Sequence, residues 1–186
     1  MKRNKYLIVD TETKTANGKI FAYAIGFMVV DRYNNIYDSY EFIIQEIIQD
    51  YKINLDKYSN KPVIIASIKS IKQLLLELIE DYDIKAIIAH NATHDKTALY
   101  NTLNGLDVIP WLCTYRTALK TICKYKTYPY KTKTGLPSAT AQDLYRYIKN
   151  QDDFIQTHTA LDDCMVCYAI YLKEYRAHKC GMVTIE

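Results

Sequence analysis

A short apolar run that ends in two closely spaced carboxylates constrains this chain most. Residues Tyr6–Val9 are apolar, and Asp10, Thr11 and Glu12 follow them directly. Side chains two residues apart on an extended segment point to the same side, so Asp10 and Glu12 project together from the end of the expected strand. Two adjacent carboxylates repel each other, and a hard divalent cation such as Mg2+ relieves that repulsion because it prefers oxygen ligands. Taken alone, the pattern also fits a strand that ends in a polar turn.

Length and composition indicate one globular domain. The chain has 186 residues, of which 49% are apolar and 24% charged, and its formal net charge is +3. These values are ordinary for a folded protein, so we expect residues 1–186 to form a single domain with its own core. The longest uncharged apolar run, residues 20–30, is too short to cross a bilayer, and no signal peptide is recognisable. A soluble, cytoplasmic protein is expected.

The five cysteines are expected to pack in the core as free thiols. Their odd number, without a secretory signal, argues against a disulfide framework. Cys164 and Cys167 have the spacing of zinc ligands, but no second Cys or His pair completes a site, and both lie in a helical apolar segment.

The hydrophobic pattern predicts an α/β fold with a mixed five-stranded sheet flanked by helices. The expected strands cover residues 5–10, 21–30, 36–43, 86–89 and 108–114, and the expected helices cover residues 67–82, 91–104, 116–124, 137–149 and 159–178. The second and third strands form an antiparallel hairpin around the polar turn 31–35. Residues 44–62 have no clear pattern and include a loop over 55–62, and residues 181–186 form a tail or a short extra strand.

A second acidic position follows the buried strand 86–89. Asp95 falls in the first turn of the next helix, where the helix dipole keeps a carboxylate ionised. An ordinary first-turn aspartate explains this position as well. His90 and His94 stand close to it in sequence, and packing explains His94 at least as well as metal binding does.

A third acidic position lies where the last helix begins. Thr159 and Asp162 match a capping box, which leaves Asp163 in the first full turn as the candidate metal ligand. His158 stands just before the helix, in a loop that is free to reach over a site.

Together, these positions resemble the motifs of the DEDD superfamily of 3'-to-5' exonucleases, which includes proofreading and RNase-T-like enzymes with a ribonuclease H-like fold. The resemblance rests on Ile-Val-Asp-Thr-Glu-Thr at 8–13, Ala-His-Asn-Ala-Thr-His-Asp at 89–95 and His-Thr-Ala-Leu-Asp-Asp at 158–163. The last motif has the His-x-Ala-x-x-Asp pattern of the histidine (DEDDh) subclass, whereas the tyrosine subclass would carry Tyr at the position of Thr159. The chain departs from the family pattern at two positions that would contact the terminal base of the substrate. The first motif has no glycine until Gly18, later than the usual glycine turn, and His94 stands before Asp95 where the family usually carries Phe.

The resemblance implies a two-metal mechanism. Asp10, Glu12, Asp95 and Asp163 would hold two Mg2+ or Mn2+ ions, and His158 would act as general base on the attacking water. The products would be 5'-mononucleotides released from a 3' end. In that family pattern, Thr11 and Thr13 lie near the terminal nucleotide, and the Thr11 backbone binds its 3'-hydroxyl.

A basic, Tyr-rich loop over residues 124–135 is a candidate substrate contact. Its cations would track phosphates and its rings would stack on bases of a single strand. A solvated loop in a chain rich in Lys and Tyr is the alternative. The four lysines are Lys124, Lys126, Lys131 and Lys133.

The leading hypothesis is a metal-dependent 3'-5' exonuclease that acts on single-stranded DNA, in proofreading, repair or nucleic-acid processing. One alternative is a 3'-5' exoribonuclease acting on small RNA or oligoribonucleotides, since the phosphodiester chemistry is the same. Another is a non-catalytic nucleic-acid-binding or polymerase-associated module. Nucleic acid with single-stranded 3' ends is the expected partner, and a homodimer or a polymerase complex remains open.

Overall fold

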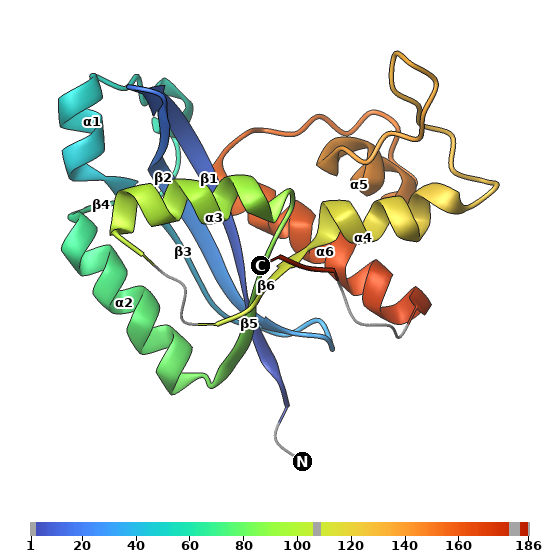
Figure 1. The fold of residues 1–186 in the computed structure, drawn as a ribbon, viewed down its shortest axis with the longest axis horizontal. Coiled ribbons are helices and arrows are strands. Elements are labelled where there is room, and N and C mark those ends of the chain that lie inside the picture. The colour runs from blue at the N-terminus through green and yellow to red at the C-terminus, as the bar shows by residue number, and fades with distance from the viewer. Residues whose placement is uncertain (1–2, 106–108, 179–182, 186) are drawn as a thin grey trace.

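A twisted seven-stranded sheet forms the centre of the molecule (Figure 1). The computed structural model describes residues 3–105, 109–178 and 183–185. The strand order across the sheet is β4-β3-β2-β1-β5-β6-β7. The strands are β1 (Lys5–Ala16), β2 (Lys19–Asp31), β3 (Ile36–Ile44), β4 (Ile64–Ala66), β5 (Ile84–Ala89), β6 (Trp111–Cys113) and β7 (Thr184–Ile185).

The pairing of the strands confirms the mixed sheet and the predicted hairpin. Strands β1, β2 and β3 are antiparallel neighbours, whereas β5 is parallel to β1 and β6 is parallel to β5. The predicted count of five strands is too low, because the edge strands β4 and β7 have only three and two residues. Such short strands carry too few residues for a hydrophobic pattern. Val108, where the fifth strand was expected to begin, lies outside the described residues, and β6 is shorter than predicted.

Among the described residues, six α-helices and two 3-10 segments connect the strands. Their bounds are α1 (Gln45–Tyr51), α2 (Ile68–Asp81), α3 (Ala92–Leu103), α4 (Thr114–Lys120), α5 (Ala141–Lys149), α6 (Ala160–His178), η1 (Asp56–Tyr58) and η2 (Ile122–Lys124). The unassigned residues 44–62 therefore contain α1 and η1. The helix expected from residue 137 begins at Ala141, because the hydroxyl of Thr140 caps it by accepting from the Asp143 N–H. The helix expected over 116–124 is split into α4 and η2.

The sheet separates two apolar clusters, and β1 contributes to both. Leu7 and Val9 pack with residues of α1, α2 and α3, whereas Ile8 packs against Cys164, Cys167 and other residues of α6. In Figure 1, α1 and α2 lie on one side and α4, α5 and α6 on the other. Because side chains alternate along a strand, Asp10 is expected on the side of α6 and Thr11 on the side of α3.

The described cysteines are buried and free, as predicted. Cys113, Cys123, Cys164 and Cys167 form no disulfide, and Cys180 lies outside the described residues. Within the described part of the chain, no helix is long and apolar enough to cross a membrane.

Candidate active site

Strand β1 and helix α6 bring three carboxylates together. Asp10, Glu12 and Asp163 each offer one oxygen atom, and these atoms lie within 4.8 Å of one another. Asp10 and Glu12 leave β1 on the same face, and Asp163 comes from the first turn of α6. Carboxylate oxygens gathered in this way are the ligands that hard divalent cations prefer.

A glycine opposite Asp10 allows α6 to come this close. Asp10 is the pairing partner of Gly26 in β2. A Cβ atom at Gly26 would lie 2.3 Å from the carbonyl carbon of Ala160 and 2.5 Å from the backbone nitrogen of Leu161. The missing side chain therefore makes room for the start of α6 beside the strand that carries Asp10.

The same helix start is held by a buried carboxylate of β3. Glu41 is 5% exposed, and its Oε1 atom accepts a hydrogen bond of 3.0 Å from the N–H of Leu161. This bond satisfies one of the free N–H groups at the helix N-terminus and favours a negative charge there.

Asp95 is positioned from the other face of β1. The backbone N–H and the hydroxyl of Thr11 both donate to Oδ1 of Asp95, at 2.9 and 2.8 Å. The residue between the two β1 carboxylates therefore orients the aspartate of α3. Asp95 lies outside the group of three, and after burial its charge contributes to raising the pKa of Asp10. The Thr11 N–H is engaged in this contact, and its proposed role toward a 3'-hydroxyl stays a prediction.

Burial and mutual repulsion raise the pKa values of these aspartates. The pKa of Asp10 is well above its usual value because the group is buried and Asp95, Asp163 and Glu12 surround it. Burial, with repulsion from Glu12, raises the pKa of Asp163 to about 6. The pKa of Asp95 is raised to about 7, mainly by burial, although the hydrogen bonds from Thr11 act in the opposite direction. The cluster thus holds more negative charge than its surroundings neutralise.

Lys57 is a site residue that the sequence did not indicate. Its Nζ atom lies 2.9 Å from Oε2 of Glu12 and donates a 2.6 Å hydrogen bond to the carbonyl oxygen of His158. The ammonium also lies 5.4 Å from the ring centre of Tyr23 and 5.2 Å from that of Tyr58. Lys57 belongs to η1, in the segment without a recognisable pattern, so no periodicity or motif could reveal it.

His158 borders the acidic group from the solvent side. Its side chain is 72% exposed, and Nδ1 lies 3.9 Å from Oδ2 of Asp163. Its backbone has a φ of +54°, which turns the chain into α6. Position and exposure leave the imidazole free to meet a substrate.

Asp162, the predicted capping acid, is separate from the group of three. Its Oδ2 atom accepts hydrogen bonds from the hydroxyls of Thr159 and Thr157, at 2.8 and 2.6 Å, and contacts the Lys61 ammonium. This network fixes the loop that carries His158.

The two histidines near Asp95 have different surroundings. His90 is structural: its Nε2–H donates to the Ala139 carbonyl at 3.0 Å, and its Nδ1 accepts from the Thr114 hydroxyl at 2.9 Å. Burial lowers the pKa of His90 to about 4. His94 is exposed, and its Nε2 atom lies 3.2 Å from the hydroxyl of Thr13, so these two side chains form one edge of the site.

The basic loop differs from the expectation. Its central ring, Tyr128, is buried, packs edge-on against Tyr147 with ring centres 5.1 Å apart, and donates a hydrogen bond of 2.6 Å to Ser138. The prediction that this ring stacks on bases is therefore wrong, because it packs in the cluster formed with α5 and α6. Within the described part of the chain, no hydrogen bond or ion pair links the loop lysines to the acidic side chains. The exposed lysines are Lys124, Lys126, Lys131 and Lys133.

Solved structures similar to this one include exonucleases, although no family model and no curated protein sequence matches the chain. The 3'-exonuclease that recognises the 3' end of the histone mRNA stem-loop superposes with a TM-score of 0.64 at 9% identity, over 99% of this chain and 71% of that one. E. coli exonuclease I in complex with a dT13 oligonucleotide gives a TM-score of 0.63 at 11% identity, over 93% of this chain. S. pombe Pop2p in its Mg2+- and Mn2+-bound form gives 0.53 at 13% identity, over 94% of this chain and 84% of that one.

At sequence identities of 9–13%, these structural similarities show a shared fold. The chain spans only 41% of the exonuclease I chain, so it corresponds to one part of that protein. The element order, the mixed sheet and the flanking helices agree with the architecture predicted from the hydrophobic pattern. The chain therefore has the ribonuclease H-like fold of solved 3'-exonucleases.

Proposed function

We propose that this chain is a metal-dependent 3'-5' exonuclease, with residues 1–186 as one exonuclease domain. It removes nucleotides from the 3' end of single-stranded DNA and releases 5'-mononucleotides. The observation that carries the proposal is the convergence of Asp10, Glu12 and Asp163 to within 4.8 Å, with Asp95 fixed beside them by Thr11. This convergence occurs in a fold that solved 3'-exonucleases share.

The donor set fits divalent metal ions. All four candidate ligands are carboxylates, their repulsion raises the pKa of Asp10, and Oδ1 of Asp163 is buried without a hydrogen-bond partner. Asp10, Glu12, Asp95 and Asp163 would hold two Mg2+ or Mn2+ ions. Such ions, when bound, favour the ionised form of an attacking water and stabilise the leaving 3'-oxygen. Pop2p, which has the same fold, was solved in an Mg2+- and Mn2+-bound form.

His158 acts as the general base. Its Nδ1 faces Asp163, so the imidazole can take the proton of the attacking water while the neighbouring carboxylate favours the resulting charge. The water oxygen bonds to phosphorus, the bond from phosphorus to the 3'-oxygen breaks, and the shortened strand keeps a 3'-hydroxyl. Lys57 anchors the backbone of His158 and holds Glu12 at the same time.

The remaining contacts are assigned by position. Thr13, with His94 beside it, meets the terminal nucleotide at the edge of the site. Thr11 lies next to that nucleotide but serves the site mainly by holding Asp95. The exposed lysines of the basic loop bind the phosphate backbone; they are Lys124, Lys126, Lys131 and Lys133.

An exoribonuclease acting on small RNA or oligoribonucleotides is the second candidate. One structural neighbour recognises a histone mRNA stem-loop and another was solved with dT13, so the shared fold occurs with either nucleic acid. A non-catalytic binding module is less well supported, because all four carboxylates and His158 are present.

One experiment tests activity and substrate together. The protein is incubated with 5'-labelled single-stranded DNA, duplex DNA and single-stranded RNA, in Mg2+, Mn2+ or EDTA. We expect a ladder of products shortened from the 3' end, strongest on single-stranded DNA, that disappears in EDTA and in Asp10→Ala. The matched control is Asp50→Asn, which alters an exposed carboxylate of α1 and should leave the ladder intact. Absence of degradation of every substrate in both metals would contradict the enzyme assignment, and a ladder on RNA alone would establish the alternative.

A further inference from the structure

One stripe of α6 relates two separate cavities, one beside the acidic site and one cationic, and between them Val166 is 4% exposed and packs against α5. Residues at steps of three or four lie on the same face of a helix. Asp162, Val166, Ala169, Lys173 and Arg176 follow this spacing, and the cavities at the two ends of the stripe are lined by these and neighbouring residues of α6. The opposite face of α6 packs on the sheet through Cys164 and Cys167.

The end of the stripe near the acidic site is apolar and aromatic. A cavity of about 280 Å³ adjoins Asp163, and it lies between α5 and α6. Tyr145 of α5 and Phe154 of the following loop line it, with ring centres 4.3 Å apart. Met165 of α6 is 48% exposed at the same cavity. Such a surface suits the flat face of an unstacked base.

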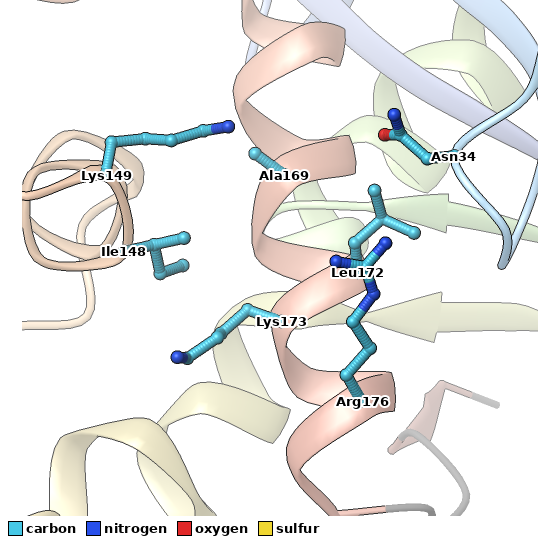
Figure 2. A pocket seen from close by; sticks show the side chains of 7 residues that line it. All are labelled: Asn34, Ile148, Lys149, Ala169, Leu172, Lys173 and Arg176. Carbon is cyan, nitrogen blue, oxygen red and sulfur yellow. The ribbon is translucent and has the colours of Figure 1, made fainter.

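The far end of the stripe is cationic. Lys149 of α5 and Lys173 and Arg176 of α6 line a pocket of about 380 Å³. Figure 2 shows these three side chains together with Ile148, Ala169 and Leu172, which line the same pocket. No acidic residue lines this pocket, and none of the three cations forms an ion pair within the described residues. A neighbouring cavity of about 370 Å³ shares Arg176 and adds Arg32, which extends the positive surface.

We propose that this α5–α6 groove, which runs from Asp163 to Lys149, Lys173 and Arg176, holds the single strand whose 3' end enters the active site. The inference rests on the proposed function and names the path of its substrate. Three cations that form no ion pair within the described residues attract a phosphate backbone, and one of them, Lys149, also lies 5.8 Å from the ring centre of Tyr145 at the apolar end. The apolar end of the groove receives bases that are not paired. A base stacked inside a duplex exposes no free face to such a cavity, so a single strand fits the groove better than a duplex.

The length of the groove sets the smallest substrate that uses it. Asp163 and Arg176 are thirteen positions apart on one helix, which corresponds to about 20 Å along its axis. A mononucleotide cannot span this distance, whereas a longer strand contacts both ends. The three cations should therefore affect oligonucleotides and leave the reaction of a mononucleotide ester largely independent of them.

The test compares two triple variants. Lys149→Gln, Lys173→Gln and Arg176→Gln remove the cations of the groove, whereas Lys69→Gln, Lys72→Gln and Lys85→Gln remove three charges from α2 and the start of β5. Binding of a labelled single-stranded oligonucleotide is titrated over a range of salt concentrations, with Asp10→Ala added so that the strand stays intact. Hydrolysis of the long oligonucleotide and of the p-nitrophenyl ester of thymidine 5'-monophosphate is measured without Asp10→Ala.

We expect the groove variant to bind the strand at least tenfold more weakly. The slope of log affinity against log salt should fall by about 2, since each phosphate contact on a single strand contributes about 0.7. The ratio of oligonucleotide to ester hydrolysis should also fall at least tenfold, and the control variant should match the parent protein. Equal binding and equal salt slopes in the two variants would overturn the groove assignment. If neither substrate is hydrolysed but the cations still control strand binding, the proposed function fails and the groove stands.

Discussion

The Nζ atom of Lys57 lies 2.9 Å from Oε2 of Glu12, so the acidic site carries a counter-charge of its own. The same ammonium donates to the carbonyl oxygen of His158 and partly offsets the rise in the pKa of Asp10 that burial and the neighbouring carboxylates cause. One lysine of η1 thereby connects the strand that bears two carboxylates with the loop that bears the proposed base. Because one ammonium makes both contacts, loss of its charge would affect both the carboxylate Glu12 and the backbone position of His158.

Replacing Lys57 by Gln should make the protein depend more on metal. The two side chains of the ion pair are 30% and 19% exposed, so its loss should lower the free energy of unfolding in EDTA by about 1 kcal/mol at most. Without the Lys57 ammonium, the repulsion among the carboxylates is stronger. Bound Mn2+ relieves more repulsion in the variant, so it should raise the thermal midpoint of the variant more than that of the parent protein. Thermal unfolding in EDTA and in Mn2+ measures both effects. Lys14→Gln, an exposed change on β1, is the control, and an equal gain from Mn2+ in all three proteins would argue against this role.

A methyl group at Gly26 should displace the start of α6. The Cβ atom would lie 2.3–2.5 Å from backbone atoms of Ala160 and Leu161, and backbone cannot rotate away as a side chain can. We expect Gly26→Ala to cost about 1–3 kcal/mol of stability and to lower turnover more than tenfold, because Asp163 moves with the helix. Urea unfolding and exonuclease rates test this. Gly18→Ala is the comparison: its φ of +72° brings a small strain but the site is open, so its turnover should stay close to that of the parent protein.

The alternation along β1 is the part of the site that the sequence specifies best. Its period of two places Asp10 and Glu12 on the face toward α6 and Thr11 on the face toward α3. The structure agrees with this arrangement: Thr11 contacts Asp95 of α3, and Asp10 lies close to Asp163 of α6. The hairpin was predictable from the apolar run of β2 and the polar turn 31–35 that follows it, and α2 was predictable from its periodic apolar face.

Other features depend on contacts between distant segments, which a local pattern does not encode. Lys57 reaches the site from a 3-10 segment without periodicity, and the role of Gly26 is visible only once α6 lies against β2. Tyr128 was expected to face solvent because its loop is rich in lysine, but α5 offers it an apolar surface. Strands β4 and β7 form only because the sheet already presents an edge to them.

Replacing Asp95 by Asn should stabilise the metal-free protein above neutral pH. The pKa of Asp95 in the folded protein is about 7, above the value of 3.8 for an exposed aspartate, so the folded state binds the proton more tightly. This contribution to stability is complete below pH 4 and is lost as the pH rises towards 7. Asn keeps the acceptor for Thr11 without the charge. The thermal midpoint of the variant relative to the parent protein in EDTA should therefore rise between pH 5 and pH 8.

The difference between the two proteins is the informative quantity. His90, whose pKa is lowered to about 4, acts in the opposite direction, because its stabilising contribution is lost as the pH falls below about 6.5. His90 is present in both proteins, so its effect cancels in the difference. A difference that stays constant from pH 5 to pH 8 would show that Asp95 is ionised throughout, contrary to its burial. With Mn2+ present, the parent protein should have the higher thermal midpoint, because the variant lacks one carboxylate ligand.

His158→Asn should abolish most of the turnover while the metal site remains. The side chain is 72% exposed and its Nδ1 lies 3.9 Å from Asp163, so its removal leaves no buried gap and keeps all four carboxylates. Loss of a general base typically lowers the rate by a factor of about 10²–10⁴. Single-turnover rates on single-stranded DNA measure this, and the rise in thermal midpoint caused by Mn2+ should equal that of the parent protein. Because the vacated position is open to solvent, added imidazole should restore part of the rate. Turnover close to that of the parent protein would rule out His158 as the base, and loss of the Mn2+ effect would instead assign the residue to metal binding.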